Sequence, residues 1–164
     1  MKYLLILFII AVALAPLTHF LPSKRQRQQA RMREHAAVEG LFVEFRDLPG
    51  SEQDPDMRRG SSQVIYYGKR LPPARGKPRS RRAWLPREEG WRGLGHREAM
   101  SETLAGLPAS VLAASVDEGS CGVYWREAGE DEDAARIVQQ VQAWAAELGS
   151  VSRGSREAAA DDFS

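Results

Sequence analysis

Cys121 is the single cysteine of this 164-residue chain, and with His96 it forms the one nucleophile and base pair that can be named from the sequence. A thiol becomes a useful nucleophile when a neighbouring base or positive charge lowers its pKa. Cys121, however, opens an expected strand beside Val123 and Trp125, where cysteine behaves as a small hydrophobic residue. We therefore expect a packed structural thiol, and an enzyme that uses Cys121 is the alternative.

No pattern of metal ligands or cofactor contacts accompanies this pair. His19, His35 and His96 are scattered along the chain, without cysteines or carboxylates at the spacing of a zinc or iron site. Gly93 and Gly95 form an isolated G-x-G, and the P-loop, kinase and hydrolase signatures are missing from the sequence. The sequence predicts no cofactor, no metal and no small-molecule substrate, and it favours binding or scaffolding over catalysis.

Basic residues form two clusters that could bind anions. The first cluster contains Lys24, Arg25, Arg27, Arg31 and Arg33. Clusters of about four to eight basic residues beside a membrane contact anionic lipid, so these side chains are candidates for lipid contact or act only as a topology determinant. The second cluster is a weaker candidate for a basic binding loop: Lys69, Arg70, Arg75, Lys77, Arg79, Arg81 and Arg82. Aromatic residues flank it, but they are expected in strands and core, so nucleic acid is not the expected partner.

The position of the first cluster depends on the N-terminal segment that comes directly before it. The nineteen residues from Tyr3 to Leu21 contain no side chain that is fully charged at neutral pH, close to the ~20 residues that cross a bilayer. We therefore predict a transmembrane anchor over residues 1–22 of a single-pass protein of the bacterial inner membrane. The basic residues after the span place the N-terminus outside and the domain in the cytoplasm. A cleaved secretory signal is the alternative, with possible sites at Ala11-Val12-Ala13 and Ala13-Leu14-Ala15.

The rest of the chain predicts one small α+β domain. Its single cysteine excludes an intrachain disulfide, and 27% charged residues with a net charge of +1 suit an ordinary globular domain. Ser23 is placed to cap a basic juxtamembrane helix over residues 23–40. The domain itself covers residues 41–149, and residues 150–164, which are small and charged, are predicted to form a disordered tail.

Hydrophobic alternation predicts a small antiparallel sheet in that domain. The expected strands cover residues 41–48, 63–71, 83–85, 111–116 and 121–126, and the last two form a hairpin. Residues 90–95 are expected to be a loop and residues 97–107 a weak helix. Apolar residues at helical spacing after Gly129 predict an amphipathic helix that ends at Gly149 and covers the sheet.

Three stretches carry a resemblance to short, uncharacterised bacterial single-pass inner-membrane proteins. They are Leu4 to Pro22, the segment Pro22-Ser-Lys-Arg-Gln-Arg-Gln-Gln, and Gly122-Val-Tyr-Trp-Arg-Glu with the helix after it. The span and its basic exit also resemble YajC, the accessory subunit of the bacterial preprotein translocase, over about thirty residues. The resemblance implies one span and a small cytoplasmic domain, and it assigns no functional residue. The expected partners are the lipid bilayer and an unidentified protein.

Overall fold

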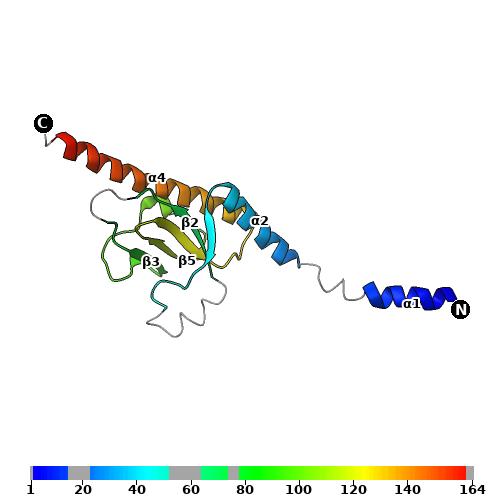
Figure 1. Ribbon diagram of the computed structural model, residues 1–164. Helices are drawn as coiled ribbons and strands as arrows, with labels where there is room; N and C mark the ends of the chain where they lie inside the picture. Colours follow the sequence, from blue (N-terminus) through cyan, green and yellow to red (C-terminus); the bar gives the residue numbers. More distant parts are fainter. Residues whose placement is uncertain (1, 15–22, 52–63, 74–77, 162–164) are drawn as a thin grey trace.

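A six-stranded antiparallel sheet organises the domain, with the strand order β1-β2-β6-β5-β3-β4 (Figure 1). The computed structural model describes residues 2–14, 23–51, 64–73 and 78–161. The strands are β1 (Phe42–Phe45), β2 (Ile65–Arg70), β3 (Arg82–Arg87), β4 (Gly90–Gly93), β5 (Val111–Val116) and β6 (Ser120–Trp125). The helical elements are α1 (Lys2–Leu14), α2 (Lys24–Val38), the 3-10 turn η3 (Glu102–Leu104) and α4 (Asp131–Asp161).

Helices α2 and α4 pack together on one face of the sheet (Figure 1). The apolar stripe of α4 supplies Ile137, Val141 and Trp144, which are buried against strand residues of β2, β3, β5 and β6. Met32 and Ala36 of α2 join the same core. Each aliphatic side chain buried in this way contributes about 1.5–3 kcal/mol. The opposite face carries a smaller buried cluster: Leu48, Val64, Tyr66, Leu85, Ala113 and Tyr124.

The predicted α+β class, the antiparallel sheet and the hairpin of β5 and β6 are confirmed. Two local predictions are wrong: residues 90–93 form strand β4, and residues 97–107 contain only the short turn η3. Gly90 takes a φ of +116°, which lets the chain turn back tightly after β3. Pro86 is accepted in β3 because β5 pairs only with Arg82, Ala83 and Trp84, so the strand needs no further donor on that side.

The prediction of a membrane-spanning helix is wrong, and so is the inner-membrane location that was inferred from it. Helix α1 has 13 residues, which at about 1.5 Å per residue span about 20 Å of a bilayer core ~30 Å thick. No helix in the described part of the chain is long and apolar enough to cross a membrane. Residues 15–21 of the predicted span lie outside the described residues.

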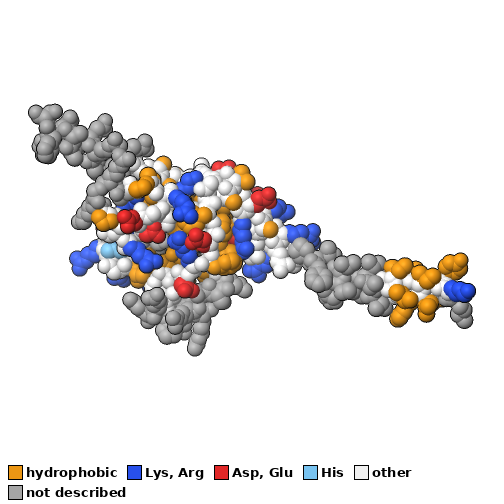
Figure 2. All heavy atoms as spheres, in the orientation of Figure 1, with side chains coloured by type: hydrophobic (Ala, Val, Ile, Leu, Met, Phe, Trp, Pro, Cys, Tyr) orange, Lys and Arg blue, Asp and Glu red, His pale blue; other side chains and the backbone are white. Residues whose placement is uncertain are grey.

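The side chains of α1 from Tyr3 to Ile10 are exposed (Figure 2). Their exposed fractions lie between 50% and 87%. Neither core cluster of the described residues includes any of them. Helix α1 therefore takes no part in holding the sheet, which α2 and α4 support.

The predicted disordered tail is also wrong over most of its length. Helix α4 does not end at Gly149 but continues to Asp161 (Figure 1). Each of the two glycines inside this helix, Gly149 and Gly154, costs only about 1 kcal/mol, and the residues after them include a run of three alanines that favours helix. Residues 162–164 lie outside the described part of the chain.

Candidate functional site

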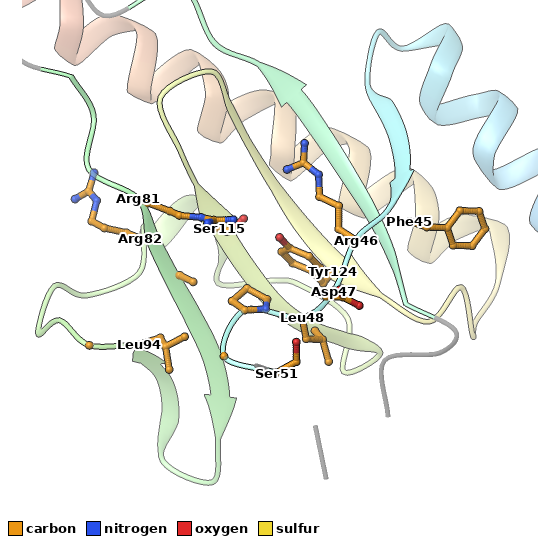
Figure 3. Close-up of a pocket in the computed structure, with 14 residues that line it drawn as sticks. Phe45, Arg46, Asp47, Leu48, Ser51, Arg81, Arg82, Leu94, Ser115 and Tyr124 are labelled. Atoms are coloured by element: carbon orange, nitrogen blue, oxygen red, sulfur yellow. The ribbon is translucent and has the colours of Figure 1, made fainter. Parts of the chain in front are cut away.

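A groove of about 730 Å³ lies on the sheet face opposite the helices (Figure 3). One wall is the segment from Phe45 to Ser51 that follows β1, and the other is formed by the start of β3 together with Leu94 and Gly95. Ser115 of β5 and Tyr124 of β6 lie between the walls. The groove is thus assembled from segments far apart in the sequence.

Strand alternation explains why these residues meet. Successive side chains of a strand point to opposite faces, so residues paired across neighbouring strands share a face. The register pairs Ala83 with Ser115, Ser115 with Gly122, and Tyr66 with Tyr124. Trp125 and Val123 alternate with Tyr124 and belong to the core beneath the helices. The same alternation places Arg81, two residues before Ala83, on the groove side.

A pair of glycines makes room for the Tyr66 ring beside the groove. Gly68 and Gly122 are directly opposite each other in β2 and β6. A Cβ atom built on Gly122 would lie 2.7 Å from Cζ of Tyr66, and one on Gly68 would overlap the same ring. The ring therefore lies across the two glycine positions, where any side chain would displace it.

Arg46 is held in a fixed position at the edge of the groove. Its Nε donates to the Glu44 carboxylate at 2.8 Å, and its guanidinium carbon lies 4.2 Å from the ring centre of Tyr66 and 5.5 Å from that of Phe42. Burial opposes the charge, but the hydrogen bond to Glu44 and the nearby Tyr66 hydroxyl outweigh it and raise the pKa of Arg46. Nη1 is 3.8 Å from Asp117, beyond hydrogen-bond distance. The Nη edge of the guanidinium therefore has only this longer ion pair and no hydrogen bond among the described residues.

Hydroxyl groups lie beside Arg46. The Tyr66 side chain is buried, and burial raises the pKa of its phenol, while the nearby hydroxyls of Ser120 and Ser115 act in the opposite direction. Within the described part of the chain the Tyr66 oxygen has no hydrogen bond of acceptable geometry. The Tyr124 ring is 4.8 Å from that of Tyr66. Guanidinium and hydroxyl groups together form a surface suited to an anionic group.

The structure places the basic residues of the predicted loop, residues 69–82, in different surroundings. Lys69 donates to the Glu39 carbonyl at 3.3 Å, and Arg79 donates to the carbonyls of Pro72 and Glu118 at 3.0 and 3.3 Å. Arg82 is ion-paired with Glu98 and lies over Trp84. Arg70 lies 5.1 Å from the Phe42 ring, and Arg81 lines the groove. Arg75 and Lys77 lie outside the described residues. Only Arg81 of the predicted set is thus a lining residue with no carboxylate partner among the described residues.

The residues of the first basic cluster also differ in their contacts. Lys24, Arg25 and Arg27 are exposed at the start of α2. Arg31 lies 3.6 Å from Asp131, and Arg33 is paired with the buried Glu127. Arg33 is therefore a structural residue that attaches α2 to the domain, which its position in a run of basic residues did not reveal.

Cys121 and His96 are not brought together. Cys121 is fully buried in β6, and burial raises its thiol pKa to about 12. His96 follows β4, packs against the Trp84 ring at 5.1 Å, and its Nε2 lies 3.0 Å from the Ala83 carbonyl oxygen. Strands β5 and β3 separate the two positions in the sheet. The geometry gives no support to a thiol nucleophile activated by this histidine.

The described residues contain no group of three or more potential metal-ligating side chains. The main residues of the groove, Arg46, Ser115, Tyr124 and the adjacent Tyr66, were not identified from the sequence. They come from four elements, and their meeting depends on the strand order. The one signal that pointed to this face was a glycine in each of two expected strands, Gly68 and Gly122, which marks a close approach.

No protein-family model, no curated protein and no solved structure matches this chain. The resemblance of the three stretches named above to single-pass proteins, and of about thirty N-terminal residues to YajC, stays a prediction from the sequence. The site must therefore be interpreted from its own geometry.

Proposed function

We propose that this protein is a binding module that holds an extended segment of another protein in the groove on the sheet face opposite the helices. The observation that carries the proposal is the difference between the two faces of the sheet. Helices α2 and α4 fill one face with apolar side chains, whereas the opposite face is hollowed between Leu48 on one wall and Leu94 on the other. Grooves with apolar walls and a few placed polar groups are a common form of binding site.

The contents of the groove favour binding over catalysis. Its polar lining contains arginines, one aspartate, two serines and a tyrosine, but neither histidine nor cysteine. A catalytic site needs a nucleophile or an acid and base held within hydrogen-bond reach of each other. Asp47 is exposed, and among the described residues it makes no hydrogen bond to Ser115 or Tyr124. A scaffolding role agrees with this chemistry.

Site-specific photo-crosslinking in cells that express the full chain tests the proposal. A photoreactive phenylalanine analogue replaces Leu94, which is 40% exposed on the groove wall, and in a matched protein it replaces Val38, which is 79% exposed on α2. We expect a discrete crosslinked partner from position 94 and none of that mass from position 38. Identical products from both positions, or a product containing only two copies of this chain, would contradict the proposal.

A further inference from the structure

We infer that the groove recognises a carboxylate side chain of an acidic partner segment, with Arg46 and Arg81 as the positive contacts. This inference rests on the proposed function and adds the chemistry of the ligand. It concerns the groove end where Ser115 and Tyr124 lie between the two arginines (Figure 3).

Arg46 is preorganised for such a contact. The Tyr66 and Phe42 rings support the guanidinium, and Glu44 binds only its Nε. A planar guanidinium offers further N–H donors in a fixed fork that matches a carboxylate. Because the position of the side chain is already fixed, a ligand that binds the Nη edge loses little of its affinity to ordering the arginine.

The nearby carboxylates neutralise Arg46 in part but not Arg81. Arg46 is ion-paired with Glu44 at 2.8 Å, and its Nη1 lies 3.8 Å from Oδ2 of Asp117. Asp117 is committed to the turn between β5 and β6, where its Oδ1 accepts from the backbone nitrogens of Gly119 and Ser120 at 2.9 and 2.7 Å. Arg81 has no carboxylate within ion-pair distance among the described residues, and Asp47 is the one acid in the lining. Arg81 therefore supplies a positive charge without a carboxylate partner among the described residues, and Arg46 with the hydroxyls of Ser115 and Tyr124 supplies further donors to a negative group.

An acidic protein segment fits these observations better than a free anion. The groove extends past the arginines between the apolar side chains of Leu48 and Leu94, which an isolated anion would not contact. An extended peptide can place a carboxylate between the arginines and lay its neighbouring residues along those walls. Charge complementarity of this kind sets specificity and association rate.

The experiment measures binding of poly-L-glutamate of about twenty residues to the full chain, by NMR shifts of backbone amides and arginine Nε–H groups. Arg46→Gln and Arg81→Gln, singly and together, are compared with Arg25→Gln/Arg27→Gln, which removes two exposed positive charges from α2. We expect shifts at Arg46, Arg81 and Ser115 that weaken at high salt. The groove double variant should bind about ten-fold or more weakly, because it loses charge-assisted hydrogen bonds from both arginines, and the α2 variant should bind nearly as well as the parent.

An equal loss of poly-L-glutamate binding in both double variants would overturn the inference, since binding would then follow the net charge of the protein. Shifts that appear with inorganic phosphate but not with poly-L-glutamate would also overturn it. If Arg46→Gln disturbs the fold, Arg81→Gln alone carries the test, because Arg81 is exposed. A crosslink at Leu94 that persists in Arg81→Gln and at high salt would refute the acidic ligand and leave the proposed function standing. If no crosslinked partner forms at position 94 in the parent or in any variant, both the acidic ligand and the proposed function would be refuted.

Discussion

The Glu127 carboxylate and the Arg33 guanidinium form a two-point ion pair that joins α2 to the segment between β6 and α4. Arg33 Nε lies 2.8 Å from Oε1 and Nη2 lies 2.5 Å from Oε2, while Tyr67 donates its hydroxyl to Oε1 at 2.9 Å. Glu127 is also the one described non-glycine residue with a positive φ, +46°. That backbone conformation costs about 1 kcal/mol or more, so the three hydrogen bonds hold Glu127 where its carboxylate can reach α2.

Glu127→Gln should lower the free energy of unfolding by about 2 kcal/mol, because a neutral amide cannot accept from Arg33 at two points and still accept from Tyr67. The expected loss is kept below that of a fully buried pair because the Arg33 side chain is 37% exposed. Urea unfolding followed by tryptophan fluorescence measures it. Arg33→Gln should cost a similar amount, and the double variant should cost clearly less than the sum.

Glu130→Gln is the matched control, since Glu130 is exposed three residues further along the chain. It should change stability by no more than about 0.5 kcal/mol. Additive effects of Glu127→Gln and Arg33→Gln would show that the pair does not act as a unit.

The sequence was informative where one element decides its own structure. Ser23 and Gln26 form a capping box at the start of α2, and the apolar spacing after Gly129 predicted α4. It failed at residues 90–93, where a strand of only four residues depends on pairing with β3. It failed again at the N-terminus, because nineteen uncharged residues fit a spanning helix by length alone, while the described helix stops at Leu14.

The same alanine substitution should have opposite effects at two glycines. In Gly122→Ala the new Cβ would lie 2.7 Å from both the Gly68 Cα and the Tyr66 Cζ, so the sheet and the ring cannot both stay in place. We expect a loss of about 1–3 kcal/mol. In Gly149→Ala nothing lies within 4 Å of the new atom inside α4, and a gain of about 0.5–1 kcal/mol is expected from helix propensity. Thermal unfolding by circular dichroism distinguishes the two signs, and a loss in Gly149→Ala would contradict the reason given.

Gly122→Ala should also alter the groove, which gives it a second readout. Displacement of the Tyr66 ring removes the support on which the Arg46 guanidinium rests at 4.2 Å. Poly-L-glutamate should therefore bind the variant more weakly even under conditions where it stays folded. Unchanged binding would show that Arg46 does not need this support.

Cys121 should react with a disulfide reagent such as dithionitrobenzoate only when the protein unfolds. Its side chain has no exposed surface and its pKa is raised to about 12, so the thiolate fraction at neutral pH is negligible. We expect no colour change over hours in the native protein at pH 7.5 and full reaction of one thiol within minutes in concentrated urea. Rapid reaction of the native protein would contradict this prediction and would support an enzyme that uses Cys121.

The groove shows why candidate sites are harder to predict than elements. Arg46 looked like an ordinary strand-end arginine, and Ser115 and Tyr124 are unremarkable members of two expected strands. Their meeting with Arg81 requires β3 to pair with β5 rather than with its sequence neighbour β2. Basic residues could be counted from the sequence, but which of them has a carboxylate partner depends on the tertiary structure.

Alkaline pH should destabilise the protein through Tyr66 and Tyr67. Burial raises the pKa of both phenols, and for Tyr67 the charge of the Glu127 carboxylate adds to the effect. Both pKa values are higher in the folded chain than in the unfolded chain, where tyrosine titrates near 10, so the unfolded state releases these protons first. The stabilisation is complete below about pH 10 and is lost as pH rises, by about 1.4 kcal/mol per pH unit for each tyrosine while the folded form stays protonated. Urea unfolding between pH 8 and 11.5 should show this slope, and Tyr67→Phe should remove the part due to one proton. A slope unchanged in Tyr67→Phe would mean that Tyr67 ionises equally in both states.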